Sequence, residues 1–376
     1  MNKISIVTNS LVLGGSEKMV MHTAKSLGFS VILLENDREF DVADVEISRL
    51  SKLNRQQSSF LLWVGAVISS RRLAKKLESS ESVLVYLERA LICTVCSLLF
   101  LKERPRIIVN VESDLAYKYG KYGSIGKRVL STLYCFADDI VFKTIENSKS
   151  FTRFLPEVNA RKHVINNPIL TGVNESRLDV NYRIEGYKNI LIAGRLHLTK
   201  GIWFSICLFS ALIKKGGQFK LFIAGDGPEK QALMSHSIKL GLRIYVGDSL
   251  PEYAKDIDVF FLGAVDGMGA IYCQSDLLLA NSYSESFGLT VVESIICGTP
   301  VVASKFGGVL DEITSHYINV VDVTPQNSDE IKHIERWLEA IEYSSSVVVS
   351  DEYKELLEAR FSNDKYLYSV RKLLNC

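Results

Sequence analysis

Two glutamates lie eight positions apart, one in a polar loop and one in the apolar segment that follows it. Glu285 belongs to a loop of small residues, and Glu293 lies about one turn into an expected helix at 289–297. The first amides of a helix lack partners within it and carry partial positive charge, so they can hold an anion. The flanking carboxylates could accept hydrogen bonds from the hydroxyls of a sugar and of a ribose. Such a site would suit a ligand in which a diphosphate joins a sugar to a ribose. Acidic residues also occur at helix N-termini for dipole reasons alone, and this alternative stays open.

A second group of charged residues follows an expected buried strand and precedes an expected apolar helix at 202–213. The run Gly-Arg-Leu-His-Leu-Thr-Lys-Gly places Arg195 and Lys200 between Gly194 and Gly201. Glycine at such a turn permits close approach of the backbone to a ligand. A forked guanidinium and a compact ammonium together suit phosphate oxygens. A basic surface turn with no ligand would have the same composition.

These two segments, in this order, resemble the retaining glycosyltransferases of family four (glycosyl transferases group 1), which have the GT-B fold. The motifs that carry the resemblance are Gly-Arg-Leu-x-x-x-Lys-Gly and the later Glu-x7-Glu. Further pieces agree in order along the chain, and the match covers roughly residues 1 to 370. These pieces are Gly14-Gly15-Ser16-Glu17, Tyr134-x-x-Ala137-Asp138, Asn166-Asn167-Pro168, Gly225-Asp226-Gly227-Pro228, and Gly307-Gly308-x-x-x-Glu312.

The resemblance implies a role for each matching residue. Glu285 would contact the donor sugar and Glu293 the ribose, while Arg195 and Lys200 would hold the diphosphate. The turn whose main-chain amides would meet the phosphates and the sugar comprises Ser286, Phe287, Gly288, Leu289 and Thr290. Gly14 and Gly15 match the glycine loop of the first domain. Glu17 matches a glutamate that is common there, and its role stays open.

One segment departs from the pattern of the family. Many members have a histidine near the reacting sugar, after the strand that ends here near position 110. This chain instead has Val111-Glu112-Ser113-Asp114, which is nearer to the Ser-Glu-Arg-Asn of a subset of the family. Glu112 is therefore a candidate catalytic residue facing the cleft. The alternative is an acid at the end of a strand that pairs with a nearby Lys or Arg.

Composition limits the class of protein. A chain of 376 residues with 47% hydrophobic residues can form about two domains with separate cores. The net charge of +1 gives no basic footprint for nucleic acid. The cysteines are scattered through apolar segments, which indicates buried thiols in a reducing compartment. Cys93-x-x-Cys96 has no second cysteine pair and no nearby histidine, so a core helix is expected there and not a zinc site.

Short apolar strands alternating with helical segments predict an α/β protein with two doubly wound, Rossmann-like domains. We expect an N-terminal acceptor-side domain at 1–172, a polar linker at 173–188, and a nucleotide-sugar-binding domain at 189–350. The resemblance implies that the domains face each other across a cleft, and that helical residues 351–376 cross back onto the first. The expected strands are Ile4–Val7, Val31–Leu34, Val83–Tyr86, Ile107–Val111, Ile140–Phe142, Val164–Ile165, Ile190–Ala193, Leu221–Ala224, Ile244–Val246, Val259–Leu262, Leu277–Ala280 and Val301–Ala303.

The expected activity is transfer of a hexosyl or N-acetylhexosaminyl group from a nucleotide diphosphate to an acceptor, with retention of configuration. We expect a UDP-sugar in preference to a GDP-sugar, and no metal. Asp256-Ile-Asp258 resembles a manganese motif of another transferase fold, but it precedes a strand instead of following one. A sugar-nucleotide epimerase, a phosphorylase and a non-catalytic sugar-nucleotide-binding subunit stay open as alternatives. A dinucleotide oxidoreductase is disfavoured because Gly14-Gly15 does not form Gly-x-Gly-x-x-Gly.

The family resemblance implies a glycan or polyprenyl-linked glycan acceptor, as in bacterial surface polysaccharide or lipopolysaccharide synthesis at the cytoplasmic side of the membrane. The apolar stretches 58–70 and 90–101 are too short for a membrane span, so the chain is expected to be cytoplasmic or peripheral. Basic residues cluster at Arg71, Arg72, Lys75 and Lys76, and again at 118–128. Such clusters could meet anionic lipid headgroups, although solvated helix faces have the same composition.

Overall fold

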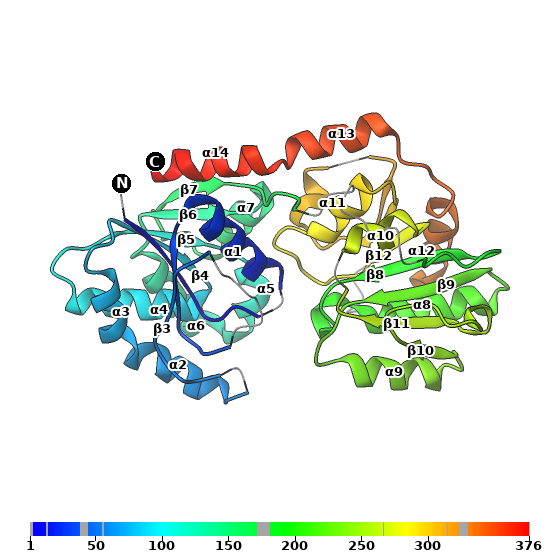
Figure 1. The fold of residues 1–376 in the computed structure, drawn as a ribbon, viewed down its shortest axis with the longest axis horizontal. Helices are drawn as coiled ribbons and strands as arrows, with labels where there is room; N and C mark the ends of the chain where they lie inside the picture. The colour runs from blue at the N-terminus through cyan, green and yellow to red at the C-terminus, as the bar shows by residue number, and fades with distance from the viewer. Residues whose placement is uncertain are drawn as a thin grey trace. The chain divides into compact units, whose positions relative to one another are not determined.

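The computed structural model describes residues 3–12, 14–37, 44–54, 56–170, 181–265, 267–313, 315–322 and 330–375. The chain forms two compact units (Figure 1). The first unit contains Met1–Asn167 and Asn363–Cys376, and the second contains Pro168–Ser362. The first unit is therefore built from two separate pieces of sequence.

The first unit is built around a seven-stranded parallel sheet with the order β3-β2-β1-β4-β5-β6-β7. The strands start on one side of β1 and continue on the other, which is the doubly wound arrangement. Their bounds are β1 Ile4–Thr8, β2 Ser30–Leu33, β3 Ile47–Arg49, β4 Ser82–Tyr86, β5 Arg106–Asn110, β6 Asp139–Phe142 and β7 Arg161–Val164.

Helices cover both faces of this sheet, as a parallel sheet requires. One face packs against α1 and α14, and the other against the helices between β3 and β7. The helices are α1 Gly15–Leu27, α2 Ser59–Ile68, α3 Ser70–Leu77, α4 Glu88–Ser97, η1 Leu98–Phe100, α5 Leu115–Tyr119, η2 Gly120–Tyr122, α6 Gly123–Tyr134, α7 Ile145–Phe154 and α14 Asn363–Leu374.

The C-terminal helix α14 is an integral part of the first unit. Tyr366 and Val370 are buried in the same cluster as Val20 and Val141. The hydroxyls of Thr23 and Tyr366 form a buried hydrogen bond of 2.6 Å between α1 and α14. Removing α14 would therefore expose both apolar surface and a buried hydroxyl.

One buried carboxylate links three neighbouring strands of the first unit. Asp139 opens β6, and its fully buried side chain accepts hydrogen bonds from Arg106 Nε of β5 at 2.7 Å and from Arg161 Nε of β7 at 2.9 Å. His163 Nε2 lies 2.8 Å from the same carboxylate. Burial acts to raise the pKa of Asp139, but the hydrogen bonds from these partners outweigh burial and lower the pKa well below its usual range.

The second unit contains another seven-stranded parallel sheet, with the order β10-β11-β9-β8-β12-β13-β14. Its strands are β8 Lys188–Ala193, β9 Phe219–Ala224, β10 Ile244–Val246, β11 Val259–Gly263, β12 Leu277–Ala280, β13 Val301–Ser304 and β14 Ile318–Val321. Its helices are η4 Leu198–Lys200, α8 Ile202–Lys214, α9 Lys230–Lys239, η5 Ala254–Asp256, α10 Met268–Cys273, α11 Leu289–Ile296, η6 Gly308–Asp311, α12 Glu330–Ser344 and α13 Asp351–Arg360.

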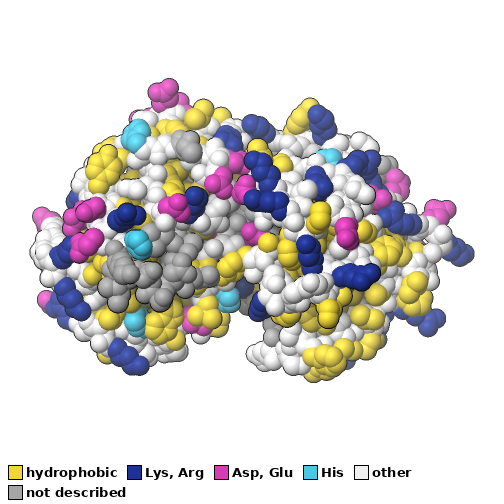
Figure 2. Space-filling model, turned by 180° about the vertical axis from the view of Figure 1, so that it is seen from behind, with side chains coloured by type: hydrophobic (Ala, Val, Ile, Leu, Met, Phe, Trp, Pro, Cys, Tyr) yellow, Lys and Arg dark blue, Asp and Glu magenta, His cyan; other side chains and the backbone are white. Residues whose placement is uncertain are grey.

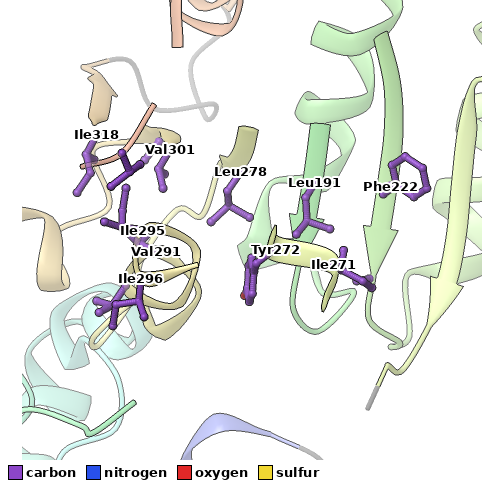
Figure 3. Close-up of a cluster of buried hydrophobic side chains, with 14 of the residues drawn as sticks. Leu191, Phe222, Ile271, Tyr272, Leu278, Val291, Ile295, Ile296, Val301 and Ile318 are labelled. Atoms are coloured by element: carbon purple, nitrogen blue, oxygen red, sulfur yellow. The ribbon is translucent and has the colours of Figure 1, made fainter. Parts of the chain in front are cut away.

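Apolar side chains from the strands and helices of the second unit form a continuous core (Figure 3). The core contains Leu191 of β8, Leu278 of β12, Tyr272 of α10, and Val291 and Ile295 of α11. All five side chains are almost completely buried. This packing fixes α10 and α11 against the centre of the sheet.

Two doubly wound parallel sheets confirm the expected fold class, whereas the expected domain limits differ from the compact units. Residues 173–180 of the expected linker lie outside the described residues, but Tyr182 and Ile184 are buried in the core of the second unit. Of the C-terminal segment 351–376, only α14 joins the first unit, while α13 packs on α11 of the second. The reason is Phe361, whose buried ring meets Phe287 edge to face.

Two short strands, β3 and β14, were not expected from the sequence. Both lie at an edge of their sheet and are partly exposed. Among the described residues, no helix combines the length and the apolar character that crossing a membrane requires.

Candidate active site

The candidate site lies where the order of strands in the second sheet reverses. From β8 the chain builds the sheet through β9 towards β10, and it then returns to place β12 on the other side of β8. Loops at the carboxyl ends of two such strands diverge and leave room for a ligand. The loop after β8 contains Arg195 and Lys200, and the loop after β12 contains Glu285. Topology therefore brings the two predicted groups of charged residues to one place.

Lys200 and Glu285 form an ion pair between Nζ and Oε1, although 85 positions separate them in the sequence. Their side chains are 26% and 17% exposed, so solvent reaches both. Ser282 Oγ also donates to Glu285 Oε1, at 2.6 Å. Glu285 is thus held in place by a cation and a hydroxyl.

The backbones of the two loops touch directly. Tyr283 N donates to Thr199 O at 2.8 Å, and Asn281 Nδ2 donates to Ser205 Oγ of α8 at 2.9 Å. Gly201 has φ +61°, and a Cβ at this position would lie 2.0 Å from Asn281 O. Only glycine fits there, and it lets η4 press against the loop after β12. This contact holds Lys200 beside Glu285.

The Gly-Asp-Gly-Pro turn after β9 supports the same loop from its other side. A Cβ at Gly225 would lie 1.8 Å from Gly194 O, and one at Gly227 would lie 2.4 Å from Leu196 O. Leu196 N donates to Asp226 O at 2.9 Å. These glycines therefore serve backbone packing beneath Arg195, which is half-buried.

The helix α11 begins at Leu289, and its first amides have no side-chain cap. Gly288 precedes it in the left-handed region with φ +94°, which turns the chain from the Glu285 loop into the helix. Thr290 lies in the first turn and is half-buried, as is Ser286 before the helix. An uncapped, partly accessible helix N-terminus four residues after Glu285 can hold an anion.

The side chain of Phe287 anchors this turn in the core. Its side chain is buried against Phe361, and its carbonyl accepts from Val309 N at 2.7 Å. A Cβ at Gly308 would lie 2.6 Å from that carbonyl. The glycine pair after β13 thus supports the turn from below, and the Phe287 ring serves the core and is not accessible to a ligand.

Glu293 is oriented by a residue that the sequence analysis did not identify. Tyr272 of α10 donates its hydroxyl to Glu293 Oε2 at 3.0 Å. Burial, and next the charge of Glu293, raise the pKa of Tyr272 well above its usual value, so the hydroxyl remains a donor at neutral pH. A tyrosine within an apolar segment is indistinguishable by sequence from an ordinary core residue. Ser282 likewise gives no sequence signal beyond its place in a small-residue loop.

The remaining predicted residues lie in the first unit. Gly14 is the N-cap of α1 with an extended backbone, and Gly15 is the first residue of the helix. A Cβ at Gly14 would lie 2.4 Å from Glu17 Oε2, so the Glu17 carboxylate folds back over this glycine. These glycines belong to the first unit, whereas Glu285 belongs to the second. That both contact the same donor molecule stays a prediction.

Glu112 pairs with a buried lysine. Lys143 Nζ, from the segment after β6, lies 3.1 Å from Glu112 Oε1, and the side chains are 1% and 5% exposed. Lys143 also lies 3.4 Å from Asn110 Oδ1 and 5.8 Å from the centre of the Tyr86 ring. This geometry matches the alternative of a strand-end acid paired with a cation. It gives no support for Glu112 as a catalytic group.

The other candidate ligand groups have structural partners. Asp258 accepts from Arg243 Nε at 3.1 Å and Nη2 at 3.0 Å, so the carboxylate of the Asp256-Ile-Asp258 motif is occupied by a guanidinium. Cys93 is buried in α4, and burial raises the pKa of its thiol to about 12. Within the described ranges, no group of three or more His, Cys, Asp or Glu side chains is arranged to hold a metal ion.

Taken together, the second unit offers a cation, a carboxylate and free helix amides within two adjoining loops. Lys200 can neutralise phosphate oxygens, and the amides at the start of α11 can donate to them. Glu285 and Glu293 can accept hydrogen bonds from hydroxyl groups. A ligand with hydroxyls on both sides of a diphosphate meets these requirements.

Comparison with known proteins agrees with this chemistry. Residues 175–348 match the family model described as Glycosyl transferases group 1. An uncharacterized glycosyltransferase of Methanocaldococcus jannaschii is 32% identical over 178 residues, which cover 43% of this chain and 42% of that protein. The O-antigen biosynthesis glycosyltransferase WclY of Escherichia coli is 25% identical over 296 residues, covering 75% of this chain and 74% of WclY.

Solved structures extend the likeness to the whole chain. HepE of Anabaena, in complex with UDP and glucose, aligns with a TM-score of 0.72 at 19% identity and covers 100% of both chains. Sucrose-phosphate synthase of Thermosynechococcus elongatus aligns with a TM-score of 0.72 at 16% identity, covering 100% of this chain and 98% of the other. At such identities the likeness shows the fold, which is that of the GT-B glycosyltransferases. Residues 175–348 therefore form a segment that is similar to the family described as Glycosyl transferases group 1, on a chain with this fold.

Proposed function

We propose that this chain is a glycosyltransferase that moves a sugar from a nucleotide diphosphate to a hydroxyl of an acceptor, with retention of anomeric configuration. The observation that carries the proposal is the Lys200–Glu285 pair at the carboxyl ends of β8 and β12, four residues before the uncapped start of α11. In this arrangement Lys200 and the helix amides bind the diphosphate. Glu285 binds the sugar, and Glu293 binds the ribose.

The reaction needs no covalent intermediate with the protein. The acceptor oxygen forms a bond to the anomeric carbon, on the face from which the diphosphate departs. The bond between that carbon and the diphosphate oxygen breaks, and its electron pair leaves with the diphosphate. The hydroxyl proton of the acceptor passes to the departing phosphate oxygen. Lys200, Arg195 and the first amides of α11 stabilise the negative charge that develops there.

The donor in this proposal is a UDP-sugar. HepE was solved with UDP and with UDP-glucose, and its fold is shared over the full chain. The acceptor is a glycan or a polyprenyl-linked glycan of a bacterial surface polysaccharide, because WclY is named for O-antigen biosynthesis. The first unit would bind this acceptor. Transfer would take place on the cytoplasmic side of the membrane and would require no metal, since cationic side chains and amides neutralise the diphosphate.

A donor screen by thermal shift tests the first step, because a ligand that binds only the folded state raises the melting temperature. A UDP-sugar should stabilise the wild-type chain more than the matching GDP-sugar. Lys200→Ala and Glu285→Ala should lower kcat/KM for transfer at least about a hundredfold, the typical cost of losing one preorganised stabilising group. Lys215→Ala is the matched control, because Lys215 pairs with Glu335 beyond the far end of α8.

The control should keep wild-type turnover, and excess EDTA should leave activity unchanged. The anomeric proton coupling of the product, measured by NMR, reports retention. Near-normal turnover of either the Lys200 or the Glu285 variant would contradict the site assignment. Loss of activity in EDTA that manganese restores would contradict the proposed metal-free reaction.

A further inference from the structure

The helix α2 has an apolar face that the first unit leaves uncovered. Its sequence is Ser-Phe-Leu-Leu-Trp-Val-Gly-Ala-Val-Ile, and only Leu62 and Ala66 are buried. Phe60 is 74% exposed and Ile68 is 72% exposed. Three further exposed apolar side chains lie between them, which are Leu61, Val64 and Val67. Spacings of three, four, seven and eight residues place these groups along one side of the helix.

More exposed apolar residues lie on elements that share the layer of α2. Leu99 of η1 is 84% exposed, and Ile125 of α6 is 81% exposed. The helix α4 packs against α2, α3 and α6, and η1 follows directly from α4 and contacts α3. Figure 2 shows hydrophobic side chains gathered at the bottom of the first unit, where α2 lies. An uncovered apolar surface of this kind usually marks an interaction site.

The charges on these elements have one sign. Residues 56–77, which include α2 and α3, contain four Lys or Arg and no Asp or Glu. Residues 115–137, which include α5 and α6, also contain four Lys or Arg and no Asp or Glu. Arg71, Lys75 and Lys76 of α3 are exposed, as are Lys127 and Arg128 of α6. The chain as a whole has a net charge of only +1, so this concentration of positive charge is local.

We infer that α2, α3, η1 and α6 form a docking surface for an anionic membrane. Apolar side chains of α2 would enter the boundary between headgroups and acyl chains, and the cations of α3 and α6 would meet anionic headgroups. A bilayer supplies both an apolar layer and a plane of negative charge, which matches this combination. A second copy of the chain would instead place two surfaces of the same positive sign against each other.

The inference is independent of the proposed transfer reaction, because binding to vesicles is measured without donor or acceptor. The probes are phosphatidylcholine vesicles with and without about one third phosphatidylglycerol, used in flotation at low and at physiological salt. The wild-type chain should float with the anionic vesicles, and binding should weaken as salt rises. Neutral vesicles should retain little of the protein.

Two variants separate the apolar and the electrostatic contributions. Phe60→Ser with Ile68→Ser should lower the partition coefficient at least tenfold, because each side chain loses the transfer energy of a large apolar group. Arg71→Gln with Lys75→Gln and Lys76→Gln should lower it about a hundredfold, at about fivefold for each cation. Ile238→Ser with Lys239→Gln, on α9 of the second unit, is the matched control and should bind within about twofold of wild type.

Circular dichroism melting establishes that each variant is folded. If the double variant Phe60→Ser with Ile68→Ser is unfolded, Leu99→Ser on η1 replaces it. Equal binding to neutral and anionic vesicles would overturn the inference, as would wild-type binding by the folded α2 and α3 variants. Light scattering after gel filtration provides a further check. A dimer of the wild-type chain that dissociates in the serine variants would assign the surface to self-association and not to a membrane.

Discussion

Removing one hydroxyl group tests whether Glu293 binds the donor. Tyr272→Phe deletes the donor of the 3.0 Å hydrogen bond to Glu293 Oε2 and leaves the buried ring in place. Hydrogen bonds to charged groups contribute about 1.5–3 kcal/mol. Glu293 is half-buried, so water can partly replace the lost donor, and the lower end of this range applies. About 1.5 kcal/mol corresponds to roughly a tenfold weaker nucleotide affinity.

Titration calorimetry with a nucleoside diphosphate measures this affinity directly. KM for the sugar nucleotide should rise by a similar factor, while kcat should change less than about threefold, because the ribose is remote from the reacting carbon. Burial raises the pKa of the Tyr272 hydroxyl, so the wild-type affinity should not fall between about pH 6 and pH 9 through loss of this proton. Tyr182→Phe is a matched control, since this buried tyrosine of the same core donates to Asp248 O.

The role of Tyr272 is refuted if folded Tyr272→Phe binds the nucleotide as tightly as the wild type does while Glu293→Ala does not. Glu293 would then act without orientation by Tyr272. If both variants bind normally, the assignment of Glu293 to the ribose is refuted.

Two further predictions concern stability. Lys143→Met should lower the free energy of unfolding by about 3–5 kcal/mol in urea denaturation, because it leaves the Glu112 carboxylate buried without its cation. Adding Glu112→Gln should recover much of this loss. An unchanged free energy of unfolding in the single variant would show that the pair is not buried in solution. Asp139 has a lowered pKa when folded, so its contribution is present above the ordinary carboxyl pKa and is lost as the pH falls through the folded value. Asp139→Asn should therefore lower the melting temperature at pH 7 and flatten its decrease below about pH 4, and parallel pH profiles would contradict this account.

Much of the fold could be predicted from the sequence because buried parallel strands are short apolar runs. The strands expected at 4–7, 83–86 and 301–303 are within β1, β4 and β13. The missed strands β3 and β14 are edge strands, each with a neighbour on one side only. A segment such as Ile47–Arg49 has too few buried positions for a pattern, and only its pairing with β2 makes it a strand.

The charged residues of the candidate site were predictable because their chemistry is visible in the residue types. Lys200 and Glu285 do lie together, as the motifs indicated. The residues that orient the site were not predictable in this way. Tyr272 reaches Glu293 only through the packing of α10 on α11, and the ring of Phe287 supports its turn only through its contact with Phe361. Contacts of this kind depend on tertiary structure and leave no local pattern.

The place of α14 has a consequence for how the protein forms on the ribosome. The sheet of the first unit is complete once residues up to Val164 have been synthesised, but Tyr366 and Val370 of its core are more than two hundred positions away. Until those residues emerge, α1 covers that face, which includes Val141, without the contribution of α14. The nascent N-terminal half would thus expose an aggregation-prone apolar surface during translation of the entire second unit. A chaperone that shields apolar segments would raise the yield of native enzyme.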